Sequence, residues 1–253
     1  KQIYPLFEGA DYIFHLAALV SVPESIINPF ECVEINVKGL LNILEAAKEK
    51  KVKKIVFSSS AAVYGDNPIS PKTTDLVLSP KSPYGITKLD GEYYLQTYLE
   101  NFELNFIALR YFNVFGPRQD PNSQYAAAIP IFINKALKNE DIIIYGDGEQ
   151  TRDFIFIDDV VNANFLASRA SANGVYNVAR GEATSVNDIV NTILKLTNSK
   201  SKIIYAEPRP GDIKHSLASI EKTKCDLNFY PKISLEEGMK KTIEYFKTKI
   251  NIP

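Results

Sequence analysis

The alternation of short, β-rich apolar runs with longer helical segments is the feature that most limits how this chain can fold. Strands are expected at residues 12–17, 54–58 and 106–111, where Ile, Val, Phe and Leu are dense. Helices are expected between them at 30–50 and 84–102, as apolar spacing or a preceding proline indicates. Strands that alternate with helices form βαβ units. The sequence therefore predicts an α/β fold with a doubly wound parallel sheet.

The sequence changes in character near residue 113. Gly, Pro, Asn and Asp become denser at 116–122, and the expected elements become shorter. A strand at 154–157 and a helix at 160–167 are expected to return to the main sheet. We therefore expect two interleaved parts, which are a main domain of residues 1–112 and 154–180 and a smaller α/β lobe of residues 113–153 and 181–253.

Composition and charge exclude several classes of protein. The 29 basic and 30 acidic residues give a net charge of −1, which does not favour nucleic acid or an anionic membrane as a partner. No apolar run approaches the ~18 residues of a membrane span, and no signal-peptide pattern is seen. Cys32 and Cys225 are far apart, as expected of reduced thiols in a cytoplasmic protein. Cysteine and histidine do not cluster, so we expect no metal site.

Tyr84 and Lys88 are four residues apart in the expected helix at 84–102, so their side chains lie on one face of it. A phenol with a pKa near 10 is a poor base at neutral pH. A neighbouring ammonium favours the phenolate and lowers that pKa, so such a pair can take a proton from a hydroxyl group. Taken alone, the pair also fits a half-buried tyrosine beside a solvated lysine.

Three serines, at 58–60, end the expected strand that precedes this helix. Hydroxyl groups at the carboxyl end of a parallel strand face the crevice in which such folds bind their ligands. A serine there can hydrogen-bond a substrate hydroxyl beside the tyrosine, although a serine-rich turn would look the same in isolation.

Several longer segments place these residues in a wider pattern. They are HLAA at 15–18, FSSSAAVYG at 57–65, SPYGITK at 82–88, RYFNVFGP at 110–117, YGDG at 145–148, TRDF at 151–154 and RPGD at 209–212. In these segments the sequence resembles the extended short-chain dehydrogenase/reductases, specifically their NAD-dependent nucleotide-sugar epimerases. The resemblance implies a Rossmann-like fold, NAD as cofactor, a UDP-sugar as substrate and a homodimer formed through the helices at 30–50 and 84–102.

One part of the family pattern does not occur in this sequence. Family members begin with a strand, a Gly-rich turn and a helix that hold the NAD pyrophosphate, whereas no G-x-x-G-x-x-G is found here. The match begins at the fourth strand of the family's fold. We therefore expect an N-terminally incomplete Rossmann sheet, and weak NAD binding by these residues alone.

The resemblance also implies the roles of individual residues. The catalytic residues would be Ser60, Tyr84 and Lys88. The cofactor-binding residues would be Ala17, Ala18, Leu19, Asn36, Ser58, Tyr84, Lys88 and Phe112. The substrate-binding residues would be Ser21, Ser60, Asn113, Tyr145, Arg152, Arg209 and Ser216, with the two arginines on phosphate oxygens, which guanidinium groups suit.

Three functions remain open at this point. The first is 4-epimerisation of a UDP-hexose through a transient 4-keto sugar. The second is a nucleotide-sugar 4,6-dehydratase or decarboxylase, but those enzymes carry acidic residues just beyond the active-site Ser or Thr. This chain has Ala61 and Ala62 there, which cannot transfer protons. The third is a non-catalytic nucleotide-sugar-binding protein, which the intact Ser60, Tyr84 and Lys88 disfavour.

Ser216 bears on which sugar fits. By resemblance it occupies the position beside the sugar C2 substituent, where members restricted to UDP-glucose and UDP-galactose carry tyrosine. Serine leaves room for an acetamido group, and Ser21 lies in the segment that resembles the N-acetyl-contacting loop. We therefore expect UDP-N-acetylglucosamine and UDP-N-acetylgalactosamine to be interconverted, with some activity on the non-acetylated pair.

Overall fold

The computed structural model describes residues 3–121, 127–208 and 214–250. The chain forms two compact units, and each unit is built from three segments of the sequence. The first unit contains Lys1–Phe112, Val161–Val178 and Ser219–Tyr230, and the second contains Asn113–Val160, Ala179–Ala218 and Pro231–Pro253. None of the helices within the described ranges is long and apolar enough to cross a membrane.

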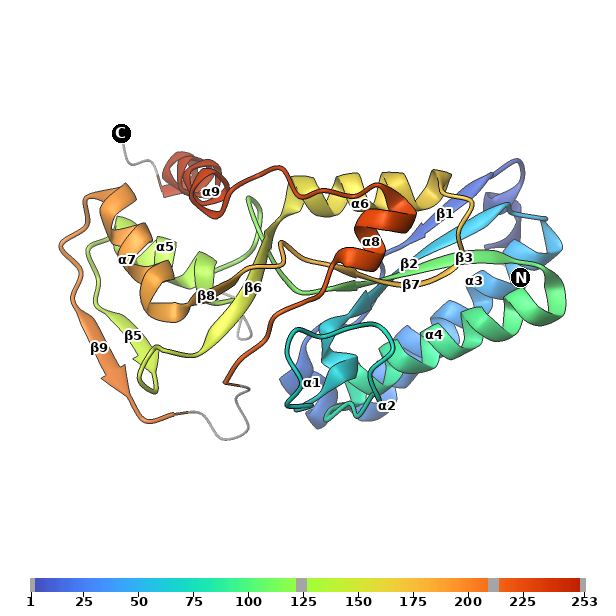
Figure 1. Cartoon of the computed structure of the whole chain (residues 1–253), viewed down its shortest axis with the longest axis horizontal. Coiled ribbons are helices and arrows are strands. Elements are labelled where there is room, and N and C mark those ends of the chain that lie inside the picture. Colours follow the sequence, from blue (N-terminus) through green and yellow to red (C-terminus); the bar gives the residue numbers. More distant parts are fainter. Residues whose placement is uncertain (1–2, 122–126, 209–213, 251–253) are drawn as a thin grey trace. The chain divides into compact units, whose positions relative to one another are not determined.

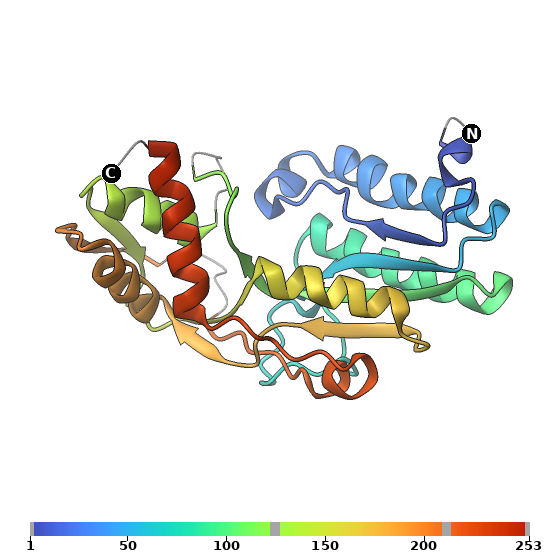
Figure 2. The same ribbon diagram turned by 90° about the horizontal axis from the view of Figure 1, so that it is seen from above.

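A four-stranded parallel sheet forms the centre of the first unit (Figure 1). Its strands, in spatial order, are β1 (Tyr12–His15), β2 (Lys54–Ser60), β3 (Asn105–Tyr111) and β7 (Gly174–Val178). Parallel neighbours need crossover connections, and helices supply them. The helices α3 (Gly39–Glu49) and α4 (Pro83–Phe102) cover one face, and residues 161–169 of α6 (Ile157–Arg169) cover the other (Figures 1 and 2). This arrangement confirms the predicted α/β fold with a parallel sheet.

The expected helix at 30–50 is a chain of three elements rather than one regular helix. A π-helical turn, η2 (Glu34–Lys38), lies between α2 (Pro29–Val33) and α3. Such turns are rare and are frequent at functional sites. The remaining elements of this unit are η1 (Tyr4–Phe7), α1 (Val22–Ile27), η3 (Ala61–Tyr64) and α8 (Glu221–Leu227).

A buried ion pair joins α4 to the sheet beneath it. The Arg110 guanidinium on β3 donates two hydrogen bonds to the Glu92 carboxylate, at 2.9 and 2.7 Å, and the two side chains are 3% and 4% exposed. Arg110 also donates to the Tyr64 hydroxyl, and Ser59 of β2 donates to Glu92. Every charge in this network therefore has partners, as a dry interior requires.

Replacing Glu92 with Gln is expected to lower the free energy of unfolding by about 3–5 kcal/mol, because it leaves the Arg110 charge buried and uncompensated. Urea unfolding followed by circular dichroism measures the loss. Glu34→Gln is the matched control, since the Glu34–Lys38 pair is solvent-exposed and such pairs contribute about 1 kcal/mol or less. If the two variants lost the same free energy of unfolding, the buried pair would contribute no more to stability than the exposed pair does.

The described residues of the second unit combine a three-stranded sheet and a two-stranded sheet with helices around their own apolar core. Its strands are β4 (Asn113–Phe115), β5 (Ile142–Tyr145), β6 (Thr151–Phe156), β8 (Ala183–Ser185) and β9 (Ile203–Ala206), paired as β4-β6-β8 and β5-β9. Its helices are α5 (Ala128–Leu137), α7 (Val186–Thr197), α9 (Leu235–Ile250) and the first residues of α6. Phe115, Phe156, Ile133 and Met239 are among the side chains buried between these elements.

The boundaries between the two units differ from those expected. The strand at 154–157 does not return to the main sheet, because β6 pairs with β4 in parallel and with β8 antiparallel. The chain returns to the first unit only at Val161, within α6, and to the main sheet only at β7. The segment Ser219–Tyr230, expected in the smaller lobe, belongs to the first unit because α8 packs beside β7. A strand's own residues do not reveal which of two sheets supplies its partner.

Candidate active site

The start of α4 sets the position of the catalytic pair expected from the sequence. Ser82 is the N-cap, and its hydroxyl accepts a hydrogen bond from the Gly85 N–H at 3.1 Å. Pro83 occupies the first helical position, where its missing N–H costs nothing. Tyr84 and Lys88 follow on the same face, one turn apart, as predicted.

Two glycines let α4 approach its neighbours closely. A Cβ atom at Gly91 would lie 2.5 Å from the Phe57 ring of β2, and one at Gly85 would lie 3.0 Å from the Ala62 carbonyl oxygen. Because α4 packs so near β2, the Lys88 ammonium reaches the Ser58 carbonyl oxygen at 2.8 Å. The structure therefore brings together the end of β2 and the first turns of α4.

Ser60 lies at the last position of β2, on the side of this strand end that Tyr84 approaches. Its hydroxyl accepts the Ala62 N–H at 3.1 Å, which caps η3, and it forms a side-chain hydrogen bond with the Tyr84 phenol. Ser60, Tyr84 and Lys88 are thus assembled within the first unit. Ala61 and Ala62 follow directly in η3, with no carboxylate at either position.

Burial dominates the electrostatics of this cluster. It raises the pKa of the Tyr84 phenol, and the hydrogen bond from Ser60 acts in the opposite direction. It lowers the pKa of Lys88 to about 8 and that of His15 to about 4, the latter with help from the Lys88 charge. The expected lowering of the Tyr84 pKa by Lys88 is not seen, because desolvation of the phenol dominates and raises this pKa.

Asn36 is fully engaged with the protein rather than open to a ligand. Its side-chain amide accepts the Leu19 N–H at 2.7 Å and donates to the Leu19 carbonyl at 3.0 Å. It also donates to the Thr87 hydroxyl at 3.0 Å. Asn36 therefore holds the segment after β1, which includes Ala17 and Ala18, at a fixed place beside α4.

Ser58 and Phe112 lie at the carboxyl ends of the two central strands. The Ser58 hydroxyl donates to the Tyr111 hydroxyl at 3.3 Å. Phe112 follows β3, is buried and packs against the Tyr64 ring with centroids 6.2 Å apart. Ser21 is the N-cap of α1 and accepts the Glu24 N–H at 3.1 Å.

Four of the predicted substrate-binding residues lie in the second unit, namely Asn113, Tyr145, Arg152 and Ser216. Asn113 begins β4 and is exposed, and Tyr145 ends β5. Arg152 on β6 donates to the Thr151 carbonyl at 2.9 Å. The Ser216 N–H donates to the same carbonyl at 3.1 Å, so the segment at 214–216 is paired with β6. Arg209 lies outside the described residues.

Asp153 is a residue whose role the sequence analysis missed. Its carboxylate is wholly buried in the second unit and accepts backbone N–H groups from Arg180, Gly181 and Ala218. Burial raises the pKa of Asp153 to about 6, and these N–H donors act in the opposite direction. Asp153 fixes the chain two residues after Ser216. The sequence did offer a signal for Asp153, because it stands next to Arg152 in the TRDF segment that carries the family resemblance.

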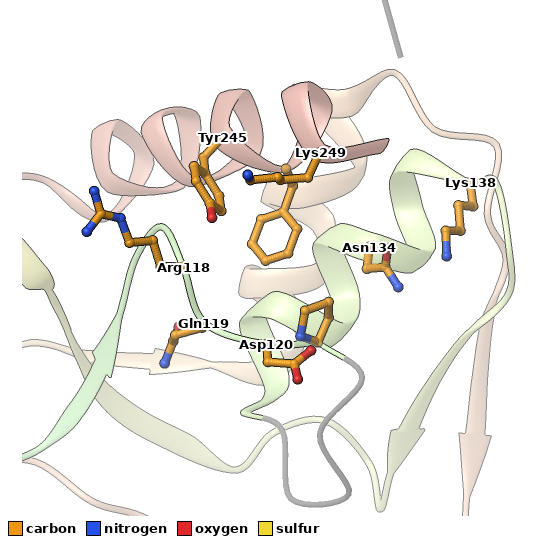
Figure 3. Close-up of a pocket in the computed structure, with 9 residues that line it drawn as sticks. Arg118, Gln119, Asp120, Asn134, Lys138, Tyr245 and Lys249 are labelled. Atoms are coloured by element: carbon orange, nitrogen blue, oxygen red, sulfur yellow. The ribbon is translucent and has the colours of Figure 1, made fainter. Parts of the chain in front are cut away.

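A pocket of about 490 Å³ in the second unit is separate from these residues (Figure 3). Its lining consists of Arg118, Gln119, Asp120, Pro121, Asn134, Lys138, Tyr245, Phe246 and Lys249. None of the residues predicted to bind cofactor or substrate is among them. The Gln119 amide is also committed to the backbone of Val114 and Gly116.

The first unit fits the nicotinamide-ribose end of NAD. The buried Lys88 ammonium has three donors, of which the Ser58 carbonyl takes one. Such a donor beside the Tyr84 phenol suits the hydroxyl groups of a ribose. By the resemblance, Leu19, whose backbone Asn36 holds, would lie along the cofactor. No residue set for the pyrophosphate is found at a Gly-rich turn, since this sequence has none.

Comparison with known proteins agrees with this geometry. The family described as the NAD dependent epimerase/dehydratase family matches residues 2–179. A UDP-N-acetylglucosamine 4-epimerase from Methanobrevibacter ruminantium M1, solved with UDP-N-acetylmuramic acid, is 42% identical with a TM-score of 0.96, over 98% of this chain and 80% of that one. A UDP-glucose 4-epimerase from Thermotoga maritima, solved with UDP-glucose, is 38% identical with a TM-score of 0.95, over 98% and 82% of the two chains.

A curated relative gives the same result from sequence. The UDP-glucose 4-epimerase of Mycolicibacterium smegmatis is 36% identical over 94% of this chain and 77% of its own length. The assembled Ser60, Tyr84 and Lys88, the parallel sheet that carries them and these similarities lead to one assignment. The chain belongs to the NAD-dependent epimerase/dehydratase family.

Proposed function

We propose that this protein is a UDP-sugar 4-epimerase that interconverts UDP-N-acetylglucosamine and UDP-N-acetylgalactosamine, with lower activity on UDP-glucose and UDP-galactose. The observation that carries the proposal is the assembly of Ser60, Tyr84 and Lys88 at the carboxyl end of β2. These groups suit proton transfer at a hydroxyl-bearing carbon, which is the chemistry that oxidation at a sugar C4 requires.

Tyr84 takes the proton of the sugar 4-hydroxyl in this proposal, and Ser60 hydrogen-bonds the same hydroxyl. Lys88 stays charged below about pH 8, so its ammonium is available to donate hydrogen bonds to the hydroxyl groups of the cofactor's ribose. NAD held beside Tyr84 and Lys88 would supply the acceptor and then the donor of the C4 hydride, with the 4-keto sugar turning between the two transfers so that its opposite face is reduced. Tyr84 then gives the proton back, so the sugar leaves with its C4 configuration inverted and no net redox change.

Ala61 and Ala62 separate this proposal from the neighbouring reactions. The family also contains dehydratases and decarboxylases, which need a further proton transfer. Methyl side chains at both positions cannot supply it, which favours epimerisation. A non-catalytic nucleotide-sugar-binding protein would not need the buried ammonium of Lys88, whose desolvation is costly.

The other residues proposed to hold the UDP-sugar belong to the second unit, except for Ser21, which belongs to the first. Arg152, with Arg209, would bind phosphate oxygens, Asn113 would approach the diphosphate and Tyr145 would lie beside the uracil. Ser216 and Ser21 would lie next to the C2 substituent. The small Ser216 side chain supports the N-acetylated sugars, since it leaves space that a tyrosine would fill.

The test is a coupled assay of both sugar pairs, with protein expressed from the complete reading frame. Conversion of UDP-N-acetylglucosamine to UDP-N-acetylgalactosamine, read by chromatography of the nucleotide sugars, is the expected result. Appearance of a UDP-4-keto-6-deoxy sugar would support a dehydratase instead, and release of CO₂ from UDP-glucuronic acid, assayed in parallel, would support a decarboxylase. Binding of UDP-sugars with no product from either pair would support a non-catalytic binding protein.

The proposal includes a homodimer formed through the helices at 30–50 and 84–102. Phe30 and Tyr93, on α2 and α4, are 87% and 62% exposed. Large apolar side chains exposed on these helices would be covered at an interface between subunits. Light scattering should give twice the monomer mass, and Tyr93→Lys should shift the protein to monomer. An unchanged mass in that variant would place any interface elsewhere.

A further inference from the structure

The N-terminal turn of α4 is held from a distant part of the chain. The first N–H groups of a helix have no partner within it. Pro83 has none to offer, and the Gly85 and Ile86 N–H groups are satisfied by Ser82. The remaining N–H, that of Tyr84 itself, donates at 3.1 Å to the hydroxyl of Ser25, which is 59 residues earlier in the sequence.

Ser25 has a single well-defined place for its hydroxyl. The residue is 0% exposed and lies on α1. Its hydroxyl donates to the Val22 carbonyl at 2.7 Å and accepts from the Tyr84 N–H. Both directions of hydrogen bonding are therefore occupied, and the hydroxyl ties α1 to the backbone of Tyr84.

The carbonyl group of Tyr84 is held as well. The Thr87 hydroxyl donates to it at 2.9 Å and accepts from the Asn36 amide at 3.0 Å. Asn36 is bonded to both the N–H and the carbonyl of Leu19. The segment at 19–36 thus holds Tyr84 at its N–H and at its carbonyl, and the two links are independent of each other.

We propose that Ser25 and Thr87 are positioning residues for Tyr84, which fix its backbone so that the phenol meets Ser60 and lies near Lys88. The inference rests on the proposed function. A misplacement of about 1 Å at a reacting group can cost about 10²-fold in rate, so a clamp on both backbone groups of the base is of direct use. An ordinary helix cap would stabilise α4 without affecting the phenol.

The test compares four variants of the protein from the complete reading frame. Ser25→Ala removes one link, and Thr87→Val removes the other with little change of shape. Thr87→Ser keeps the hydroxyl and should therefore retain the kcat and pH profile of wild type. Ser185→Ala is the matched control, because Ser185 caps α7 of the second unit by accepting the Asp188 N–H at 3.0 Å. Its loss should cost about 1 kcal/mol of stability, as loss of a cap typically does.

Ser25→Ala and Thr87→Val are expected to lower kcat by about 10- to 100-fold while KM changes by about twofold or less. The acidic limb of the pH profile of kcat should move to higher pH, since a displaced phenol loses the Ser60 hydrogen bond that lowers its pKa. The other groups acting here are Lys88 on α4, Cys32 on α2 and His15 on β1, and none of them is altered. Thr87→Ser and Ser185→Ala should keep the wild-type profile.

A second readout does not depend on turnover. In protein labelled with ζ-¹³C-tyrosine, the Tyr84 signal is identified by its absence from Tyr84→Phe, and its titration is followed by NMR. Ser25→Ala and Thr87→Val should titrate at higher pH than wild type. If wild type converts neither sugar pair, the proposed function fails, yet this titration still decides the positioning role. The inference would be overturned if Ser25→Ala and Thr87→Val both kept the kcat, the pH profile and the Tyr84 titration of wild type. It would also be overturned if Ser185→Ala changed these quantities as much as those two variants do.

Discussion

Replacing Tyr84 with Phe is expected to lower kcat by about 10²- to 10⁴-fold, the usual contribution of a general acid–base group. The substitution removes one hydroxyl, whose side-chain partner is Ser60, and leaves the half-buried ring in place. The N–H and carbonyl of Tyr84 keep their partners Ser25 and Thr87, so α4 should remain in position. Initial rates with UDP-N-acetylglucosamine at saturation, together with thermal unfolding, measure the two effects separately.

Tyr98→Phe is the matched control for this experiment. Tyr98 lies on the same helix, is largely buried and donates its phenol to Glu45. Loss of that hydroxyl should lower stability by about 1 kcal/mol and leave kcat unchanged. If Tyr84→Phe retained more than about a tenth of wild-type kcat, its hydroxyl could not be the proton acceptor.

Replacing Ser216 with Tyr is expected to remove activity on the acetylated sugars selectively. The segment at 214–216 is held to β6 through its backbone, so a larger side chain should project without unpairing it. Overpacking costs about 1–3 kcal/mol, which corresponds to a loss of about 5- to 150-fold for a substrate that carries an acetamido group. The specificity ratio of kcat/KM between the acetylated and non-acetylated pairs is the quantity to measure.

Ser216→Ala is the control for Ser216→Tyr, because it removes the hydroxyl and keeps the space. It should convert both sugar pairs at rates close to those of wild type. Equal losses on both pairs in Ser216→Tyr would contradict the steric argument. The steric argument would also be contradicted if the wild-type protein converted only UDP-glucose and UDP-galactose. The protein would then be a UDP-glucose 4-epimerase.

Elements with a local signal were predictable from the sequence. Three strands of the main sheet, β1, β2 and β3, and the helix α4 lie where apolar runs and Pro83 placed them, within two residues, whereas the fourth strand, β7, was not expected. The pairing of Tyr84 with Lys88 was predictable because a spacing of four residues in a helix fixes one face. The serines at the end of β2 were predictable for a similar reason, since carboxyl ends of parallel strands share an edge.

Elements without a local signal were not predictable. The strand β6 was expected in the main sheet, but it pairs with β4 and β8. The π-turn that carries Asn36 interrupts a segment whose apolar spacing suits one α-helix. The direction of the Tyr84 pKa shift was also misjudged, since the sequence shows a neighbouring lysine and does not show how deeply the phenol is buried.

The sequence by itself determined the local geometry: which segments are strands or helices, where α4 begins, and which face carries Tyr84 and Lys88. Capping, periodicity and glycine placement act over a few residues, so they can be read along the chain. Only the tertiary structure decided how Ser25 reaches Tyr84, how Asn36 joins Leu19 to Thr87, and how Glu92 neutralises Arg110. These contacts join residues 17 to 59 positions apart, and they exist because burial leaves each polar group no partner in water.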